Sequence, residues 1–283
     1  MDARSTPESE SVIAQSVLLV AVGVVVGASG TLVGAGGGFL LMPLLLLLYP
    51  GLSSELLTTI SLAMVCGNAI SGSIAYARMG RTDYKSGLIF AAAGVPGAVV
   101  GAIAIGYIPR RLFDGVFGVV LIAASIFLML RPVLKTVNSD PPGSRTLRVI
   151  TEADGTSHSY SYRVAVGVAM AMGIGFLSSL LGLGGGIIHV PAMVHFLNFP
   201  VHVATATSHL VLAIMTLAGT MVHVFTGAFA EGLDRIIPLT AGAIVGAQLG
   251  ARLSRRVRGA WIIRCLAIAL AMVGVRILIL AFQ

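Results

Sequence analysis

A glycine-rich break inside an apolar run occurs twice in this chain and constrains its fold more than any other feature. The sequence GAGGG at residues 34–38 returns as GLGGG at residues 182–186, 148 residues later, and Pro43 and Pro191 each follow five residues after a copy. In both places a long apolar run ends at the glycines and a short apolar run follows them. A duplicated interruption within membrane segments is typical of transport proteins.

The composition places most of the chain in lipid. Of its 283 residues, 57% are hydrophobic and 10% are charged, whereas a soluble domain has about 25% charged residues. Backbone groups find no water in the hydrocarbon core, so membrane spans are helices or closed barrels. The apolar runs are continuous and not alternating, which favours helices. We therefore expect an all-α integral membrane protein.

Charged residues and cysteines exclude several other classes of protein. The net charge of +7 comes largely from short loops between apolar runs, a pattern typical of membrane orientation and not of nucleic-acid binding. Cys66 and Cys265 lie within apolar runs and supply neither a disulfide framework nor a zinc site. We expect no metal and no other cofactor. The acidic segment at residues 1–11 lacks the positive region of a cleavable signal peptide, so we expect the first apolar run to be retained.

The apolar runs form two matching groups of five. They lie at about 12–31, 39–49, 54–77, 86–108 and 112–130, and then at about 162–181, 187–198, 202–226, 236–252 and 262–281. The groups align over nearly their whole length, and the matched pairs include Gly27 with Gly175, Ser61 with Ser208, Gly72 with Gly219, Tyr76 with His223, Gly97 with Gly246 and Gly101 with Gly250. We attribute the match to gene duplication. The expected division is a first repeat at 1–130, a linker at 131–161 and a second repeat at 162–283.

Charge placement predicts that the two repeats have opposite orientations in the membrane. In the first repeat, basic residues gather at 78–85 and again in the linker, which the positive-inside rule places in the cytoplasm. In the second repeat they gather at 252–264, the turn that matches Arg110 and Arg111 of the first. Five spans per repeat is an odd number, which such a reversal requires. We therefore expect inverted repeats in the cell membrane, with a cytoplasmic linker and both chain ends outside.

The linker contains a signal for a β-hairpin. Residues 147–151 and 157–162 flank Asp154-Gly155, a dipeptide that favours a tight turn between two strands. A two-stranded hairpin by itself is only marginally stable in water. The sequence therefore leaves open whether this hairpin is ordered.

The glycine clusters predict an anion site inside the membrane. The runs that follow them hold about 11 or 12 residues, roughly 17 Å of helix, which is too short to cross a core about 30 Å thick. Each cluster should therefore be the turn of a broken or re-entrant helix hairpin, where the first amides of the resumed helix and its dipole can bind an anion. The residues expected to do so are Gly36, Gly37, Gly38, Phe39, Gly184, Gly185, Gly186 and Ile187. The alternative is simple helix packing, because the glycines at 30, 34 and 38 have GxxxG spacing.

Polar side chains within the spans are candidates to complete this site. Polar groups facing lipid are costly, so these side chains should face the protein interior. The side chains that we expect to bind the substrate are Ser61, Asn68, Thr207, Ser208 and His209. His209 and His223 lie on one helical face and are candidates to carry a coupling proton. The alternative for each is a structural role, since Ser and Thr in membrane helices commonly bond back to their own helix and a buried histidine can be satisfied without titrating.

These motifs resemble those of the sulfite exporter TauE/SafE family. The resemblance rests on the two Gly-x-Gly-Gly-Gly clusters with their prolines, at 34–43 and 182–191, and on Thr207-Ser208 after Ala206. It covers essentially the whole membrane portion. Members are bacterial, archaeal and plant membrane proteins associated with moving sulfite, organosulfonates and related anions. The resemblance implies a small sulfur-containing anion as the substrate.

The expected site joins both repeats without being symmetric, because Ile60 matches Thr207 and Leu62 matches His209. We expect a secondary carrier, an exporter by the resemblance, that moves a small anion such as sulfite or an organosulfonate by alternating access. The alternatives are an anion channel using the same amides, or a carrier of a non-sulfur organic anion. A membrane enzyme is disfavoured because no intramembrane acid or nucleophile–base pair accompanies the histidines. The expected partners are the substrate and the lipid bilayer, without nucleic acid, and the sequence leaves homo-oligomers open.

Overall fold

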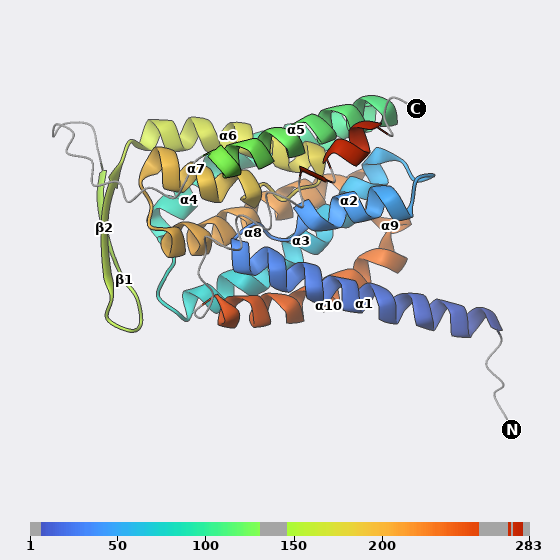
Figure 1. The fold of residues 1–283 in the computed structure, drawn as a ribbon, viewed down its shortest axis with the longest axis horizontal. Coiled ribbons are helices and arrows are strands. Elements are labelled where there is room, and N and C mark those ends of the chain that lie inside the picture. Colours follow the sequence, from blue (N-terminus) through green and yellow to red (C-terminus); the bar gives the residue numbers. More distant parts are fainter. Residues whose placement is uncertain (1–6, 131–145, 255–270, 273, 280–283) are drawn as a thin grey trace, which may run out of the picture.

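The computed structural model describes residues 7–130, 146–254, 271–272 and 274–279, and these residues form a bundle of helices with a two-stranded hairpin at one end (Figure 1). The first half contains α1 (Pro7–Val33), α2 (Gly38–Leu48), α3 (Ser54–Ala77), α4 (Tyr84–Ala104), a 3-10 turn (Ile105–Tyr107) and α5 (Arg110–Leu130). The second half contains α6 (Val164–Leu181), α7 (Gly186–Leu197), α8 (Val201–Thr226), α9 (Ala228–Glu231) and α10 (Leu233–Leu253).

Most of the expected apolar runs are helices whose ends differ from the expected ones by a few residues. The run expected at 162–181 starts late, at Val164, because Tyr162 ends a strand. The run expected at 262–281 is helical at 271–272 and 274–279, and its other residues lie outside the described part of the chain. The short helix α9 has no counterpart among the expected runs.

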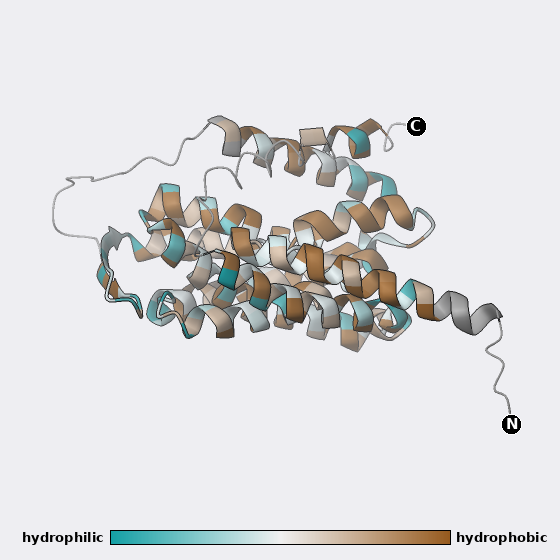
Figure 2. Ribbon diagram, turned by 60° about the horizontal axis from the view of Figure 1, so that its bottom comes forward, coloured by the Kyte–Doolittle hydropathy of each residue, from teal (hydrophilic) through white to brown (hydrophobic). Residues whose placement is uncertain are grey.

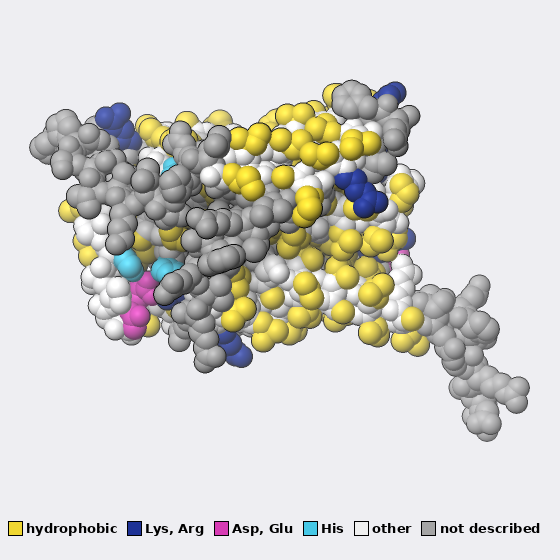
Figure 3. Space-filling view, in the orientation of Figure 1, with side chains coloured by type: hydrophobic (Ala, Val, Ile, Leu, Met, Phe, Trp, Pro, Cys, Tyr) yellow, Lys and Arg dark blue, Asp and Glu magenta, His cyan; other side chains and the backbone are white. Residues whose placement is uncertain are grey.

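Six of the described helices are long and apolar enough to cross a membrane, namely the spans within α1, α3, α4, α6, α8 and α10. Helices α2 and α7 have 11 and 12 residues, which is too short for a core about 30 Å thick at 1.5 Å per residue. Figure 2 shows that hydrophobic residues are frequent along the helices and that the hairpin carries both hydrophilic and hydrophobic residues. In Figure 3, hydrophobic side chains cover much of the visible face, and acidic and histidine side chains gather at the hairpin end.

Helices from the two halves pack mainly against each other. Helix α1 lies along α10 and α6 lies along α4, while α3 and α8 pair at the centre and also contact α10 and α4, respectively. Glycines allow this close approach: a Cβ atom at Gly101 would overlap the Phe176 carbonyl, and one at Gly250 would overlap the Ala28 carbonyl. Small residues have this function in membrane helices because lipid provides no hydrophobic drive for association.

The hairpin that the sequence left open is an ordered element. Strands β1 (Thr146–Thr151) and β2 (Ser157–Tyr162) pair antiparallel, with Thr146 opposite Tyr162. The hairpin is stabilised by the loop after α3: the Ala153 amide donates to the Met79 carbonyl at 3.0 Å, and Arg81 Nε lies 2.6 Å from a Glu152 carboxylate oxygen. These contacts supply what an isolated hairpin lacks.

The packing predicts opposite outcomes for two glycines on α6. A Cβ atom at Gly175 would overlap the Gly94 carbonyl of α4, whereas one at Gly173 would meet nothing within 4 Å. We expect Gly175→Ala to destabilise the protein by about 1–3 kcal/mol, the usual cost of overpacking, and Gly173→Ala to leave its stability unchanged or higher. The measurement is the melting temperature of the purified protein in detergent. Equal melting temperatures for the two variants would contradict the interface between α4 and α6.

Candidate functional site

Each glycine cluster forms a turn that links a long helix to a short one. Between α1 and α2, Gly34, Gly36 and Gly37 have φ angles of +87°, +73° and +88°. Between α6 and α7, the φ angles of Gly182, Gly184 and Gly185 are +65°, +74° and +75°. Side chains with a Cβ atom are strained in this left-handed region, so both turns depend on glycine.

The two turns contact each other at the centre of the bundle. A Cβ atom at Gly38 would lie 2.6 Å from the Leu183 carbonyl oxygen, and one at Gly186 would lie 2.5 Å from the Gly34 carbonyl oxygen. All four of these residues are buried. The structure therefore brings together the glycines that the sequence predicted as one site, although they are far apart along the chain.

The first amides of both short helices have no acceptor among the described residues. The amides of Gly34, Ala35 and Gly36 donate to carbonyls of α1, and those of Leu40 and Leu41 donate to Gly37. The intervening amides that make no hydrogen bond within the described chain are those of Gly37, Gly38 and Phe39, and, in the second turn, those of Gly184, Gly185, Gly186 and Ile187. Free amides at a helix N-terminus, together with the helix dipole, are suited to binding an anion.

The two repeat-related serines connect each half to the glycine turn of the other half. Ser61 Oγ donates to the Gly182 carbonyl at 2.6 Å, and Ser208 Oγ donates to the Gly34 carbonyl at 3.2 Å. Both hydroxyls are fully buried. They lie at the turns as the sequence predicted, but their hydrogens are used by the protein, so a bound anion would have to compete for them.

Asn68 and His209 belong to a polar layer beside the turns, on the side of the hairpin. Asn68 Nδ2 donates to the Gly27 carbonyl at 3.0 Å, and Asn68 Oδ1 accepts from Thr31 Oγ1 at 2.6 Å. Tyr76 donates to the Thr31 carbonyl at 2.8 Å, and its ring meets the His209 ring edge-on at 5.3 Å between centroids. His209 Nδ1 lies 3.1 Å from the carbonyl of Thr205, one turn earlier in α8. Asn68 thus holds α1 to α3.

Two histidines complete the polar groups near the turns. His223 is fully buried, and neither of its ring nitrogens has a partner in the described part of the chain. His189, which sequence reasoning did not include in the site, lies 3.4 Å from Ser208 Oγ through Nδ1. Its position three residues after Gly186, within the first turn of α7, is the signal that could have identified it.

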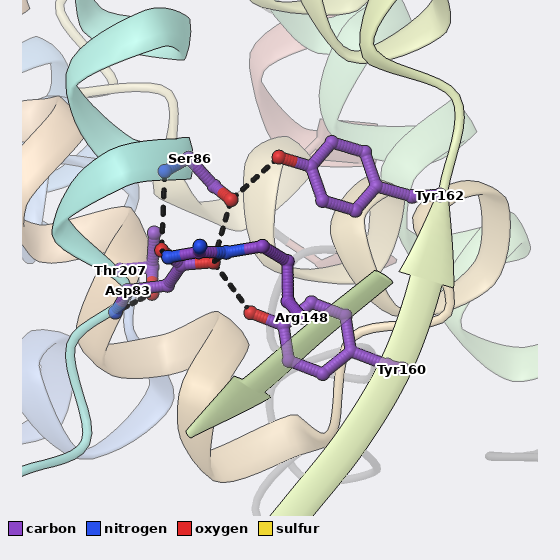
Figure 4. Close-up of polar contacts among 6 residues, drawn as sticks. All are labelled: Asp83, Ser86, Arg148, Tyr160, Tyr162 and Thr207. Carbon is purple, nitrogen blue, oxygen red and sulfur yellow. Dashed lines mark hydrogen bonds and ion pairs between the residues drawn. The ribbon is translucent and has the colours of Figure 1, made fainter. Parts of the chain in front are cut away.

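Thr207 points away from the glycine turns and contributes to a different cluster. Its Oγ1 accepts a hydrogen bond from the Asp83 amide at 3.0 Å, at the start of α4. The Asp83 carboxylate is fully buried and accepts from Arg148 at 2.5 and 3.0 Å and from the Tyr160 hydroxyl at 2.7 Å. Ser86 also donates to Asp83 and bonds Tyr162 at 2.5 Å. Figure 4 shows these six residues, which we call the Asp83 cluster.

The Asp83 cluster holds the hairpin against the bundle with a buried ion pair. Burial opposes ionisation of Asp83, but hydrogen bonds from Arg148, Ser86 and Tyr160 outweigh it and lower the pKa of Asp83 to about 2. The bond to Asp83 in turn raises the pKa of Arg148. Sequence reasoning did not select Asp83, although it is an isolated acidic residue in the basic loop at 78–85.

Asp83→Asn should release the hairpin while leaving the helices assembled. The substitution leaves the Arg148 charge, whose side chain is 22% exposed, without its partner, and losing a hydrogen-bonded charged partner costs about 1.5–3 kcal/mol. The expected result is fast protease cleavage and fast hydrogen exchange at residues 146–162, whereas Asp154→Asn at the exposed hairpin turn should behave like wild type. Equal protection of the hairpin in both variants would contradict the role of Asp83.

The same ion pair predicts how hairpin docking depends on pH. Because the pKa of Asp83 is depressed to about 2 in the folded protein, its contribution is complete above the ordinary aspartate pKa of about 3.9. The contribution is lost as the pH falls toward 2. Hydrogen exchange of the hairpin, corrected for intrinsic rates, should be constant from about pH 7 to 5 and should increase only at strongly acidic pH. An increase near pH 6 would point to another group.

Comparison with known proteins identifies the family. Residues 19–277 match the family model described as sulfite exporter TauE/SafE. The chain is 31% identical over 268 residues to a "Probable membrane transporter protein YunE" of Bacillus subtilis (strain 168), with 93% of this chain and 97% of that protein covered. No solved structure gives a significant match. The chain is thus a multi-pass membrane protein and not an enzyme, and it belongs to the TauE/SafE family of membrane transporters.

Proposed function

We propose that this protein is a secondary transporter that exports a small sulfur-containing anion, such as sulfite or an organosulfonate. The observation that carries the proposal is the meeting of two glycine turns whose helix-terminal amides are buried and have no acceptor in the described chain. Such amides can replace part of the hydration shell of an anion. The family description supplies the sulfur-containing anion as the substrate class.

The proposed architecture is two inverted repeats, each with a broken helix hairpin at mid-membrane. The paired central helices support it, because Asp83 after α3 binds Thr207 near the start of α8, while Thr226 at the end of α8 binds Glu55 at the start of α3. Those helices therefore run antiparallel. The interfaces repeat as well: the overlap of Gly101 with Phe176 has its counterpart in Gly250 with Ala28.

The hairpin end of the bundle is the proposed cytoplasmic side. Arg78 and Arg252, from the ends of α3 and α10, line one pocket of about 650 Å³, and Arg81 binds the hairpin. Basic residues of both repeats therefore gather at the same end, as the positive-inside rule requires. Helix α1 begins at the opposite end (Figure 1), which supports an N-terminus outside the cell.

The proposed mechanism is alternating access, in which the two halves rock around the glycine turns. The amides of Gly37–Phe39 and of Gly184–Ile187 bind the anion, Ser61 and Ser208 exchange their carbonyl partners for it, and Asn68 holds α1 to α3. His209 and His223 are the proposed carriers of a coupling proton, since ring nitrogens of both have no partner among the described residues. A site of amides and hydroxyls holds an anion less tightly than an arginine pair would, which suits release.

Transport by purified protein in liposomes tests the function. We expect saturable flux and counterflow for sulfite or an organosulfonate, and no flux of cations, from a panel of sulfite, thiosulfate, taurine, sulfoacetate, sulfate and carboxylates. Flux without saturation or counterflow would indicate a channel. Transport of carboxylates alone would indicate a carrier of a non-sulfur organic anion. Transport of cations would overturn the proposal.

The role of the amides is tested by removing one of them. Ile187 is in the first turn of α7, where proline fits the helical backbone and only its N–H is missing. Ile187→Pro should lower transport about tenfold or more, as expected for losing a hydrogen bond to a charged ligand. Ile187→Ala removes side-chain packing but keeps the amide, so it should transport much better than the proline variant. Equal flux from the two well-folded variants would show that the Ile187 amide does not bind the anion and that the turn has only a packing role.

A further inference from the structure

The two halves carry matching polar layers on opposite sides of the glycine turns, but among the described residues only the layer on the hairpin side is joined by hydrogen bonds between its matching positions. On the hairpin side, Asn68 and Tyr76 bond to Thr31 at 2.6 and 2.8 Å. On the other side the matching positions hold Met215, His223 and Ser179. Met215 cannot bridge as Asn68 does, and the His223 ring makes no hydrogen bond to a described residue.

Among the side chains on this second side that are at most 2% exposed, four have buried polar atoms without a partner in the described chain. They are Thr58, Ser178, Ser179 and His223. Leaving a buried donor unpaired costs about 1–3 kcal/mol, and native proteins keep few such groups. Neighbouring threonines bond back to their own helices: Thr59 donates to the Glu55 carbonyl and Thr216 donates to the Leu212 carbonyl. The four side chains, unlike these threonines, do not form a hydrogen bond within their own helix.

Two of these residues lie at the second glycine turn, and a third leads from it toward His223. The Ser178 hydroxyl packs against Gly185, where a Cβ atom would be 3.0 Å from Oγ, and the backbone of Thr58 packs against Gly182, where a Cβ atom would be 3.2 Å from the Thr58 Cα. Ser179 Oγ would be 2.8 Å from a Cβ atom at Gly219, which lies one helical turn before His223 on α8. The hydroxyls therefore continue from the free amides of α7 toward His223.

Among the described residues, the first glycine turn lacks a counterpart of the Ser178 hydroxyl, although Thr205 packs against Gly34 as Thr58 packs against Gly182. The residue that matches Ser178 is Gly30, and it packs so closely on the backbone of Gly37 that a Cβ atom would overlap the Gly37 nitrogen. Val26 fills the remaining space beside Gly37. The amides of the first turn are thus enclosed by backbone and apolar atoms, while those of the second turn are flanked by hydroxyl donors.

We infer that the anion binds off-centre, at the N-terminus of α7, where Ser178 and Thr58 join the amides of Gly185 and Gly186, and that Ser179 and His223 line its path away from the hairpin end. This inference rests on the proposed transport function and assigns specific side chains to it. The path leads toward the start of α3, where Glu55 is bound by Thr226 at 3.4 Å.

Sulfite transport in liposomes tests the binding residues. We expect Ser178→Ala and Thr58→Val each to raise the apparent KM for sulfite about tenfold or more, because each removes a donor to a charged ligand. Thr205→Val changes the residue that matches Thr58 in the other repeat, and Thr216→Val removes a hydroxyl that bonds within α8. Both controls should keep the wild-type KM. Unchanged KM values in Ser178→Ala and Thr58→Val would overturn the off-centre site.

His223→Tyr tests the path by giving the second half the tyrosine that the first half has at position 76. The new hydroxyl can reach the Ser179 carbonyl as Tyr76 reaches Thr31, so we expect a lower maximal rate at an unchanged or higher melting temperature. His223→Gln keeps a hydrogen-bonding group and should retain more flux. Wild-type rates in His223→Tyr would overturn the path. Absence of sulfur-anion flux in the wild-type protein would instead overturn the proposed function, and this inference with it.

Discussion

The structure depends on burying the N-termini of two short helices whose first amides find no acceptor in the described part of the chain. An unpaired backbone N–H away from water is costly, and here Gly37–Phe39 and Gly184–Ile187 supply several such groups close together. Contact between the turns leaves no room for side chains at two of their own positions, since a Cβ atom at Gly38 or Gly186 would overlap the opposite turn. The surrounding helices must therefore hold the turns in place, and the stability of the bundle maintains a site that is unfavourable when empty.

The interleaving of the two halves supplies this support. Helix α1 packs along α10 and α6 packs along α4, so neither half has a complete core of its own. Glycines such as Gly101 and Gly250 bring backbones into direct contact across these interfaces. Interfaces of this kind are smooth, because few large side chains interlock, and they allow helices to slide or tilt with little repacking. A carrier that rocks its halves needs such surfaces.

The features predictable from sequence were those determined by local pattern. The glycine clusters and the lengths of the apolar runs predicted the helix breaks close to their observed positions. The Asp154-Gly155 turn did the same for the two strands of the hairpin. Features determined by helix rotation were not predictable. Thr207 and Ser208 are adjacent, yet Thr207 binds Asp83 and Ser208 binds Gly34, because successive residues on a helix point about 100° apart and only tertiary packing shows which neighbour each one meets.

The adjacent residues Thr207 and Ser208 on α8 connect the hairpin to the first glycine turn. Thr207 is bonded to the amide of Asp83, whose carboxylate holds Arg148 and Tyr160 of the hairpin, and Ser208 is bonded to the carbonyl of the first glycine turn. A rotation or tilt of α8 that moves Ser208 away from Gly34 also pulls Thr207 away from Asp83. Opening the proposed site toward the hairpin therefore requires breaking bonds in the Asp83 cluster as well. The ion pair with Arg148 holds Asp83 in place while its amide bond to Thr207 breaks. The hairpin therefore contributes to the balance between the two proposed access states.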